Sequence, residues 1–153
     1  GISIGGMLAS EIAKEDNTVK AIIISSNKTH KKFPAYFRIG KYLPLYKWIP
    51  GNSKRKMIGP INLFLGARGK EQKDLLKKII TESDPLFVRW AIGAILNWES
   101  KETAPNIIHI HGTRDRLLPY RFVKADYTIQ NGGHVMTLDN HEEISAILKK
   151  LIQ

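Results

Sequence analysis

The chain has 153 residues, of which 42% are hydrophobic and 25% are charged, a balance typical of one globular domain. It contains no cysteine, which excludes disulfide bonds, thiolate metal sites and a cysteine nucleophile, and which fits a cytoplasmic location. The formal charge of +10 arises from residues 28–101, which hold 16 Lys and Arg against 5 Asp and Glu. We interpret this excess first as a solvated basic surface.

The opening segment, GISIGGMLASEIAKE, predicts a tight glycine turn followed by a helix with Met7, Leu8 and Ile12 on one face. The next segment, residues 19–24, is a short apolar run rich in β-branched side chains. Such a run is typical of a strand that is buried on both faces of a parallel sheet.

Residues 27–103 have a different character, with prolines, aromatic side chains and helix-like apolar spacing in place of strand patterning. We expect this region to be helical and to be an insertion. One amphipathic helix is predicted in KEQKDLLKKIITE, whose apolar face holds Leu75, Leu76, Ile79 and Ile80. Asp84 and Pro85 then begin another helix. Its body, LFVRWAIGAILNW, is apolar nearly all round, so we expect it to be buried or to lie against a pocket.

The strand pattern returns in the last third of the chain. Short strands are predicted at residues 107–110, ending at Gly112, and at residues 127–130. The final helix covers residues 140–151, and its apolar side holds Ile144, Ile147, Leu148 and Leu151. Because strands and helices alternate, the predicted class is α/β with a mainly parallel sheet and flanking helices.

The first five residues match the pattern G-x-S-x-G, in which a serine sits on a sharp turn between a strand and a helix. The glycines are expected to avoid collisions with neighbouring elements. The turn would present the hydroxyl of Ser3 at the amino end of the helix, where free N–H groups favour a developing negative charge. Ser3 is therefore a candidate nucleophile, and the backbone N–H of Ile4 is a candidate oxyanion donor.

A candidate acid, Asp115, follows the strand at residues 107–110, at the edge of the sheet where ligands bind in α/β proteins. A carboxylate there can hold a histidine in one tautomer. The alternative is an aspartate that bonds its own turn. The connection from Pro119 to His134 is short, which predicts a reduced crossover and makes Asp126 a rival acid.

A candidate base, His134, stands on the glycine loop Asn131-Gly132-Gly133, after the last strand. Histidine suits this role because its ordinary pKa lies near neutrality. The chain order of nucleophile, acid and base is also the one expected of a serine hydrolase on an α/β sheet.

From the serine turn onward, the sequence resembles the α/β-hydrolase fold superfamily of esterase-like and lipase-like serine hydrolases. The matching pieces are GISIGG, AIIISS, IIHIHGTRDRLLP and the GGH before the terminal helix. The resemblance implies a catalytic triad of Ser3, Asp115 and His134. It also implies a helical cap at residues 28–103, inserted into a partial core made of residues 1–27 and 104–153.

The upstream strands of that fold, and the loop that supplies its second oxyanion donor, are not in this chain. We expect these residues in isolation to fold poorly and to be inactive, whereas the full-length protein hydrolyses esters.

The resemblance implies hydrolysis of a carboxylic ester or thioester through an acyl-enzyme, without a cofactor. Related alternatives are a peptidase, a C–C hydrolase or an acyltransferase. The expected partner is a small ester or acyl substrate. Two further alternatives are that this substrate is anionic and that the cap contacts a membrane surface. A different class is an anion-binding or nucleic-acid-binding module, in which basic residues interleave with aromatic ones; we do not favour nucleic acid.

The remaining histidines have weaker functional interpretations. His109 and His111 point to the same face of one strand, but no third metal ligand follows at a suitable spacing, so no metal site is predicted. His111 is interpreted as a structural residue near the site. His30 and His141 are expected to be exposed.

Overall fold

The computed structural model describes residues 1–43, 46, 59, 62–67 and 69–153. Its helices are α1 (Ile4–Glu15), α2 (Ala35–Tyr42), α4 (Lys70–Glu82), α5 (Pro85–Asn97), α6 (Met136–Asp139) and α7 (His141–Ile152). Its strands are β1 (Ala21–Ile24), β2 (Ile107–Gly112) and β3 (Tyr127–Ile129). Within these described ranges, each helix is too short or too polar to span a bilayer.

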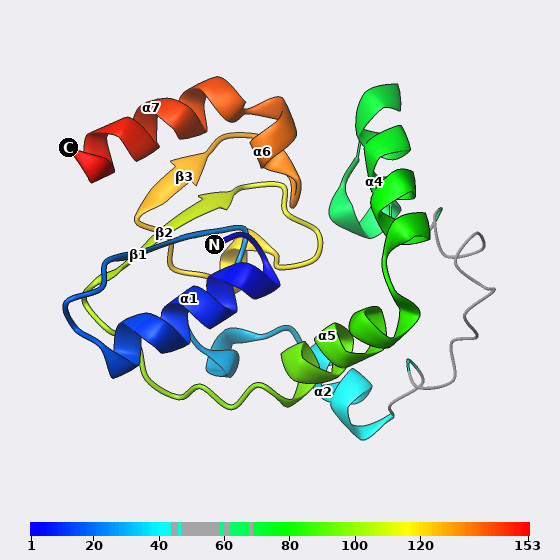
Figure 1. Ribbon diagram of the computed structural model, residues 1–153, viewed down its shortest axis with the longest axis horizontal. Helices are drawn as coiled ribbons and strands as arrows, with labels where there is room; N and C mark the ends of the chain where they lie inside the picture. Colours follow the sequence, from blue (N-terminus) through cyan, green and yellow to red (C-terminus); the bar gives the residue numbers. More distant parts are fainter. Residues whose placement is uncertain (44–45, 47–58, 60–61, 68) are drawn as a thin grey trace.

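The strands form one parallel sheet in the order β1-β2-β3, which confirms the predicted α/β class. In the register, Ala21 pairs with Ile107 and Ile110 pairs with Tyr127. On the other side of β1, Ile2 forms a parallel bridge with Ile24, so the chain before the serine turn runs alongside the sheet. The carboxyl ends of the strands point toward α4 and α5 (Figure 1).

The sheet is buried on both faces because successive side chains of a strand point to opposite sides. One face packs against α1 through Ala13, Ala21, Ile23 and Ile107. The other face packs against α6 and α7 through Ile24, Ile110, Ile129, Met136 and Ile144. This confirms the prediction of a strand that is covered on both faces.

The buried side of α1 differs from the predicted one. Met7 is buried, but Leu8 and Ile12 are 53% and 56% exposed. The side that packs against the sheet instead carries small residues, including Ser10 and Ala13, which are 0% and 1% exposed. Small side chains let the helix approach the sheet closely, so size selected this face rather than hydrophobicity alone.

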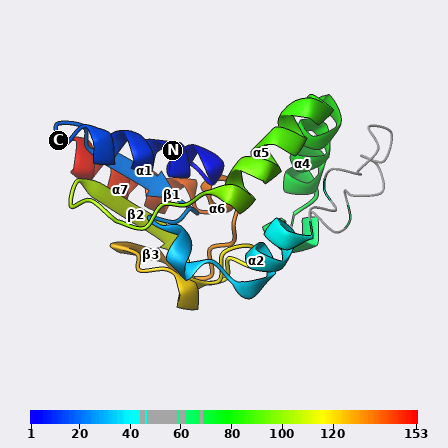
Figure 2. The same cartoon turned by 90° about the horizontal axis from the view of Figure 1, so that it is seen from below.

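Helices α2, α4 and α5 stand beside the sheet and the helices that cover it (Figures 1 and 2). Helix α2 packs against α5, with Gly40 facing Leu96, and the ring of Phe33 stacks on that of Phe37 at 4.5 Å between centroids. The helical character predicted for this region is confirmed in its described residues. Its role as a separate cap domain at residues 28–103 stays a prediction.

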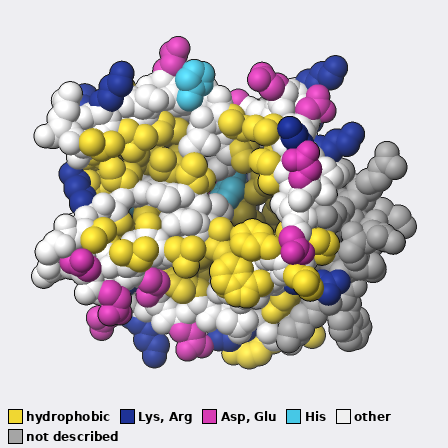
Figure 3. Space-filling model, viewed as in Figure 1, with side chains coloured by type: hydrophobic (Ala, Val, Ile, Leu, Met, Phe, Trp, Pro, Cys, Tyr) yellow, Lys and Arg dark blue, Asp and Glu magenta, His cyan; other side chains and the backbone are white. Residues whose placement is uncertain are grey.

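Helix α5 begins where the sequence predicted, because the Asp84 carboxylate accepts a hydrogen bond of 2.8 Å from the Leu86 N–H. Of the two alternatives predicted for this helix, burial or a position against a pocket, burial was wrong. None of its side chains is buried, and Leu86, Phe87 and Trp90 are 70%, 57% and 56% exposed. An apolar helix is buried only where enough neighbouring surface covers it. On the face of the protein drawn in Figure 3, hydrophobic side chains gather around a hollow.

Candidate active site

Ser3 lies on a strained turn immediately before α1, with φ 52° and ψ −121°. Its N–H donates to the Ile24 carbonyl at 3.0 Å, which ties the turn to the end of β1. The hydroxyl makes no capping hydrogen bond to the helix. The side chain is therefore available for another partner, as the sequence pattern predicts.

Close packing explains two of the glycines around this turn. A Cβ on Gly1 would lie 2.2 Å from the Gly5 carbonyl oxygen, and a Cβ on Gly6 would lie 2.6 Å from the Ser26 side chain. In contrast, a Cβ on Gly5 meets no atom of the described residues within 4 Å. The expectation that the pattern's second glycine avoids a collision was therefore wrong for these residues, and Gly6 has that role.

Ser26, two residues after the end of β1, supports the turn that carries Ser3, and the sequence analysis did not identify it. Its side chain is fully buried, and its hydroxyl donates to the Ser3 carbonyl at 2.8 Å. The bond fixes the backbone of the nucleophile candidate. A serine that follows an apolar strand is common, so the sequence carried no specific signal for this contact.

Asp115 uses its two carboxylate oxygens for different tasks. Oδ1 accepts hydrogen bonds from the N–H groups of Leu117 and Leu118 at 2.9 and 2.8 Å, which shapes the turn after β2. Oδ2 accepts from Nδ1 of His134 at 2.8 Å. The two interpretations of this aspartate, a turn residue and a partner for the histidine, therefore both hold.

The loop that carries His134 lies directly against the end of β2. A Cβ on Gly112 would lie 2.3 Å from the Gly132 carbonyl oxygen, so only glycine permits this approach. The same carbonyl accepts a hydrogen bond from the Arg114 N–H at 2.9 Å. The loop after β3 is thereby fixed beside the loop after β2.

The structure brings Ser3, Asp115 and His134 into one hydrogen-bonded line. His134 Nε2 lies 3.0 Å from Ser3 Oγ, while its Nδ1 contacts the carboxylate. Because a carboxylate oxygen only accepts, Nδ1 carries the proton and Nε2 accepts from the serine hydroxyl. The acid and the base are each 4% exposed, so their interaction is shielded from water.

At the first position of α1, the N–H of Ile4 has no acceptor within the helix. It stands beside the serine at the positive end of the helix dipole, where an oxyanion donor is expected. The second donor stays a prediction for sequence outside this chain.

The rival acid, Asp126, lies away from the line. Its Oδ2 accepts from Lys28 Nζ at 2.8 Å and from the backbone N–H of His109 at 2.7 Å. It precedes β3, at the opposite end of that strand from the histidine loop. As predicted, the crossover is reduced, since it contains only a single 3-10 turn, Tyr120–Phe122.

His109 and His111 form a fully buried pair beside the acid. His111 Nε2 lies 2.8 Å from the Leu118 carbonyl, which only accepts, so this nitrogen carries a proton. His111 Nδ1 therefore accepts from His109 Nε2 at 3.1 Å. His111 Nε2 also lies 3.6 Å from the second carboxylate oxygen of Asp115.

Burial disfavours the charged forms of both histidines. Burial, together with the neighbouring His111, lowers the pKa of His109 to about 3. Burial also lowers the pKa of His111, against the opposing effect of Asp115. Among the described residues, no group of three or more His, Cys, Asp or Glu side chains is arranged to hold a metal ion.

The described part of the cap region contacts the core at both ends. The Tyr36 hydroxyl donates to the Leu117 carbonyl, in the turn that holds the acid. Lys14 of α1 bonds the Ser100 hydroxyl and the Lys28 carbonyl. His30 was expected to be exposed but is half-buried, because its Nδ1 contacts the Ser100 carbonyl at 2.7 Å.

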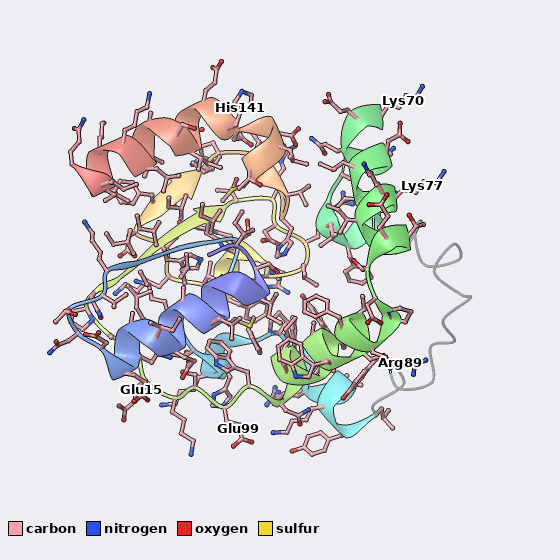
Figure 4. The ribbon with its side chains drawn as sticks, in the orientation of Figure 1. Glu15, Lys70, Lys77, Arg89, Glu99 and His141 are labelled. Atoms are coloured by element: carbon pink, nitrogen blue, oxygen red, sulfur yellow. The ribbon has the colours of Figure 1, made fainter. Side chains whose placement is uncertain are left out.

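His141, at the start of α7, is exposed as expected (Figure 4). It lies outside the hydrogen-bonded line of the candidate site.

Comparison with known proteins gave matches by structure alone, since no protein-family model and no curated protein sequence matches this chain. A thermophilic esterase from Thermogutta terrifontis superposes with a TM-score of 0.66 at 15% identity, covering 99% of this chain and 62% of the esterase. A meta-cleavage product hydrolase from Pseudomonas fluorescens superposes with a TM-score of 0.65 at 14% identity, covering 99% of this chain and 62% of that hydrolase.

These matches show that the chain has the α/β-hydrolase fold, as the sequence resemblance implied. The chain spans 62% of the length of each of the two proteins, and its three-stranded parallel sheet with flanking helices corresponds to part of that fold.

Proposed function

We propose that the protein is a serine hydrolase that cleaves carboxylic esters or thioesters through an acyl-enzyme. The observation that carries this proposal is the line from Asp115 Oδ2 through His134 to Ser3 Oγ, with donor–acceptor distances of 2.8 and 3.0 Å. A base that is held by a carboxylate and that accepts the proton of a serine hydroxyl has the geometry of an activated nucleophile.

In the first half of the proposed reaction, Ser3 Oγ attacks the carbonyl carbon while its proton passes to His134 Nε2. The carbonyl oxygen becomes an oxyanion, which we expect to accept a hydrogen bond from the Ile4 N–H. Collapse of this intermediate breaks the bond to the leaving alcohol or thiol, which takes the proton from His134. The acyl group remains on the serine oxygen.

In the second half, His134 removes a proton from water, and the hydroxide oxygen attacks the acyl carbon. The proton then returns to Ser3 Oγ as the acid is released. Asp115 stabilises the imidazolium that forms in each half, without being protonated itself. No residue of the chain changes oxidation state, and the steps need only water as the second substrate.

The test is covalent labelling of the natural full-length protein with a fluorophosphonate, together with hydrolysis of p-nitrophenyl acetate. We expect one label at Ser3, and we expect Ser3→Ala to lose both labelling and turnover while its circular dichroism spectrum is unchanged. Hydrolysis that survives in a folded Ser3→Ala variant would overturn the proposal.

A further inference from the structure

A pocket of about 370 Å³ lies between the described part of the cap region and the loop after β2. Its lining includes Asn62, Leu63, Gly66, Lys73 and Arg116. We propose that this pocket binds a carboxylate group of the substrate, so that the enzyme prefers esters that carry a negative charge. This inference rests on the proposed hydrolase function and names the substrate class of that site.

One contact and one close approach place the pocket beside the hydrogen-bonded line of Ser3, Asp115 and His134. Arg116 is the residue after the acid, and its Nη1 donates to the Leu63 carbonyl at 3.4 Å. On the other side, a Cβ on Gly133 would lie 3.7 Å from the Gly66 carbonyl oxygen, and Gly133 directly precedes His134. The pocket wall therefore lies beside the loops of both the acid and the base.

The charges of the pocket favour an anion. Both charged side chains in its described lining, Lys73 and Arg116, are cationic and exposed, and neither forms an ion pair with an acid of the described residues. The residues outside the described ranges contain no Asp or Glu. Their ionisable side chains are all basic: Lys47, Lys54, Arg55, Lys56 and Arg68.

The surrounding region strengthens this preference, because residues 28–101 hold 16 basic residues against 5 acidic ones. A positive field of this kind raises the local concentration of anions. Guanidinium and ammonium groups together suit a carboxylate, since the former binds both oxygens and the latter supplies a compact charge.

One residue of the lining, Asn62, carries a buried polar atom without a described partner. Oδ1 of Asn62 is buried and has no hydrogen-bond donor among the described residues. The volume is in the range of small-ligand sites, which span about 300–1,000 Å³.

The experiment compares neutral and charged esters on the natural full-length protein. Phenyl acetate and p-nitrophenyl acetate are the neutral substrates; 4-carboxyphenyl acetate carries the anion on the leaving group, and p-nitrophenyl hemisuccinate carries it on the acyl group. The quantity measured is kcat/KM for each charged ester divided by that for its neutral counterpart. Comparing this ratio between variants cancels the intrinsic reactivity of the esters.

We expect Arg116→Gln and Lys73→Gln each to lower the ratio by about tenfold for at least one charged ester, since each removes a charge-assisted contact. The matched controls are Arg114→Gln, in the same loop, and Lys77→Gln, one turn along α4, where Lys77 projects away from the body of the protein (Figure 4). Both controls remove one positive charge from a residue outside the described lining.

Ratios that are unchanged by Arg116→Gln and Lys73→Gln, or lowered equally by the two controls, would refute the carboxylate site. The charged ester whose ratio falls in these variants shows whether the pocket binds a carboxylate of the leaving group or of the acyl group. If no ester is hydrolysed at all, the proposed function fails. Calorimetric binding of 4-hydroxybenzoate and of succinate, with weaker binding in Arg116→Gln expected, then tests the pocket independently of turnover.

Discussion

His134 Nε2 lies 3.0 Å from Ser3 Oγ, although 131 residues separate them in the chain. The contact forms because the turn before α1 lies beside the carboxyl end of β1, at the same edge of the parallel sheet as the loops after β2 and β3. Glycines permit the close approaches around this site, of Gly6 in α1 to Ser26 after β1 and of Gly112 to Gly132. The reactive geometry therefore depends on backbone contacts as much as on the three side chains.

Asp115→Asn is expected to lower kcat for p-nitrophenyl acetate by about 10⁴-fold with little change in KM. The asparagine keeps an oxygen for the Leu117 and Leu118 N–H groups, so the turn survives. Its amide N–H group replaces Oδ2 and favours the wrong tautomer of the histidine. The measurement is steady-state kinetics on the natural full-length protein.

Asp126→Asn is the control for that substitution, because Asp126 bonds Lys28 and His109 rather than His134. We expect its kcat to stay within about threefold of the unsubstituted protein, since a change remote from the reacting atoms leaves the transition state intact. If Asp126→Asn lowers kcat more than Asp115→Asn does, the acid has been assigned to the wrong residue.

Gly112→Ala is expected to lower the free energy of unfolding by about 3 kcal/mol or more, at the upper end of overpacking effects. Its Cβ would lie 2.3 Å from the Gly132 carbonyl oxygen, a backbone atom that cannot rotate away. Urea denaturation measures the loss. The matched change is Gly133→Ala in the facing loop, where the nearest atoms are 3.7 Å away; similar losses for both variants would contradict a steric cause.

His111→Met is expected to cost about 1–3 kcal/mol of stability, because the buried Leu118 carbonyl loses its donor. His111→Gln should recover most of that loss, since its amide N–H reaches the position of Nε2. The two replacements have similar length and differ mainly in hydrogen bonding. Equal stability of the two variants would show that packing, rather than the hydrogen bond, is what His111 contributes.

The stability of the protein is expected to fall with acid because of His109. Its pKa is lowered to about 3 in the folded state, while the unfolded chain takes up this proton near pH 6.5. Between these values the unfolded state binds more protons, so the free energy of unfolding decreases as pH falls through this window. From pH 7 to pH 5, this histidine accounts for a decrease of about 2 kcal/mol.

His109→Gln keeps a donor toward His111 Nδ1 but cannot take up the proton. The variant should therefore lose about 2 kcal/mol less than the unsubstituted protein between pH 7 and pH 5, as measured by urea denaturation at each pH. If the variant and the unsubstituted protein lose the same free energy of unfolding between pH 7 and pH 5, His109 is protonated in the folded state at pH 5.

The sequence alone predicted the parallel sheet, the helices α1, α4, α5 and α7, and the order of the serine, aspartate and histidine. Strand runs, helical periodicity and the glycine patterns are local signals, and each is written in neighbouring residues. The start of α5 at Asp84 is an example, because the capping oxygen and the N–H that it binds are two residues apart.

Only the tertiary structure decided which surfaces are covered and which loops meet. The exposure of α5, the small-residue face of α1, the support of Ser3 by Ser26 and the pairing of His109 with Asp126 all depend on segments that are distant in sequence. The same is true of the close approach of Gly66 to Gly133, which places a basic pocket beside the loop of the base. Burial and close approach are properties of two surfaces together, and a residue pattern specifies only one of them.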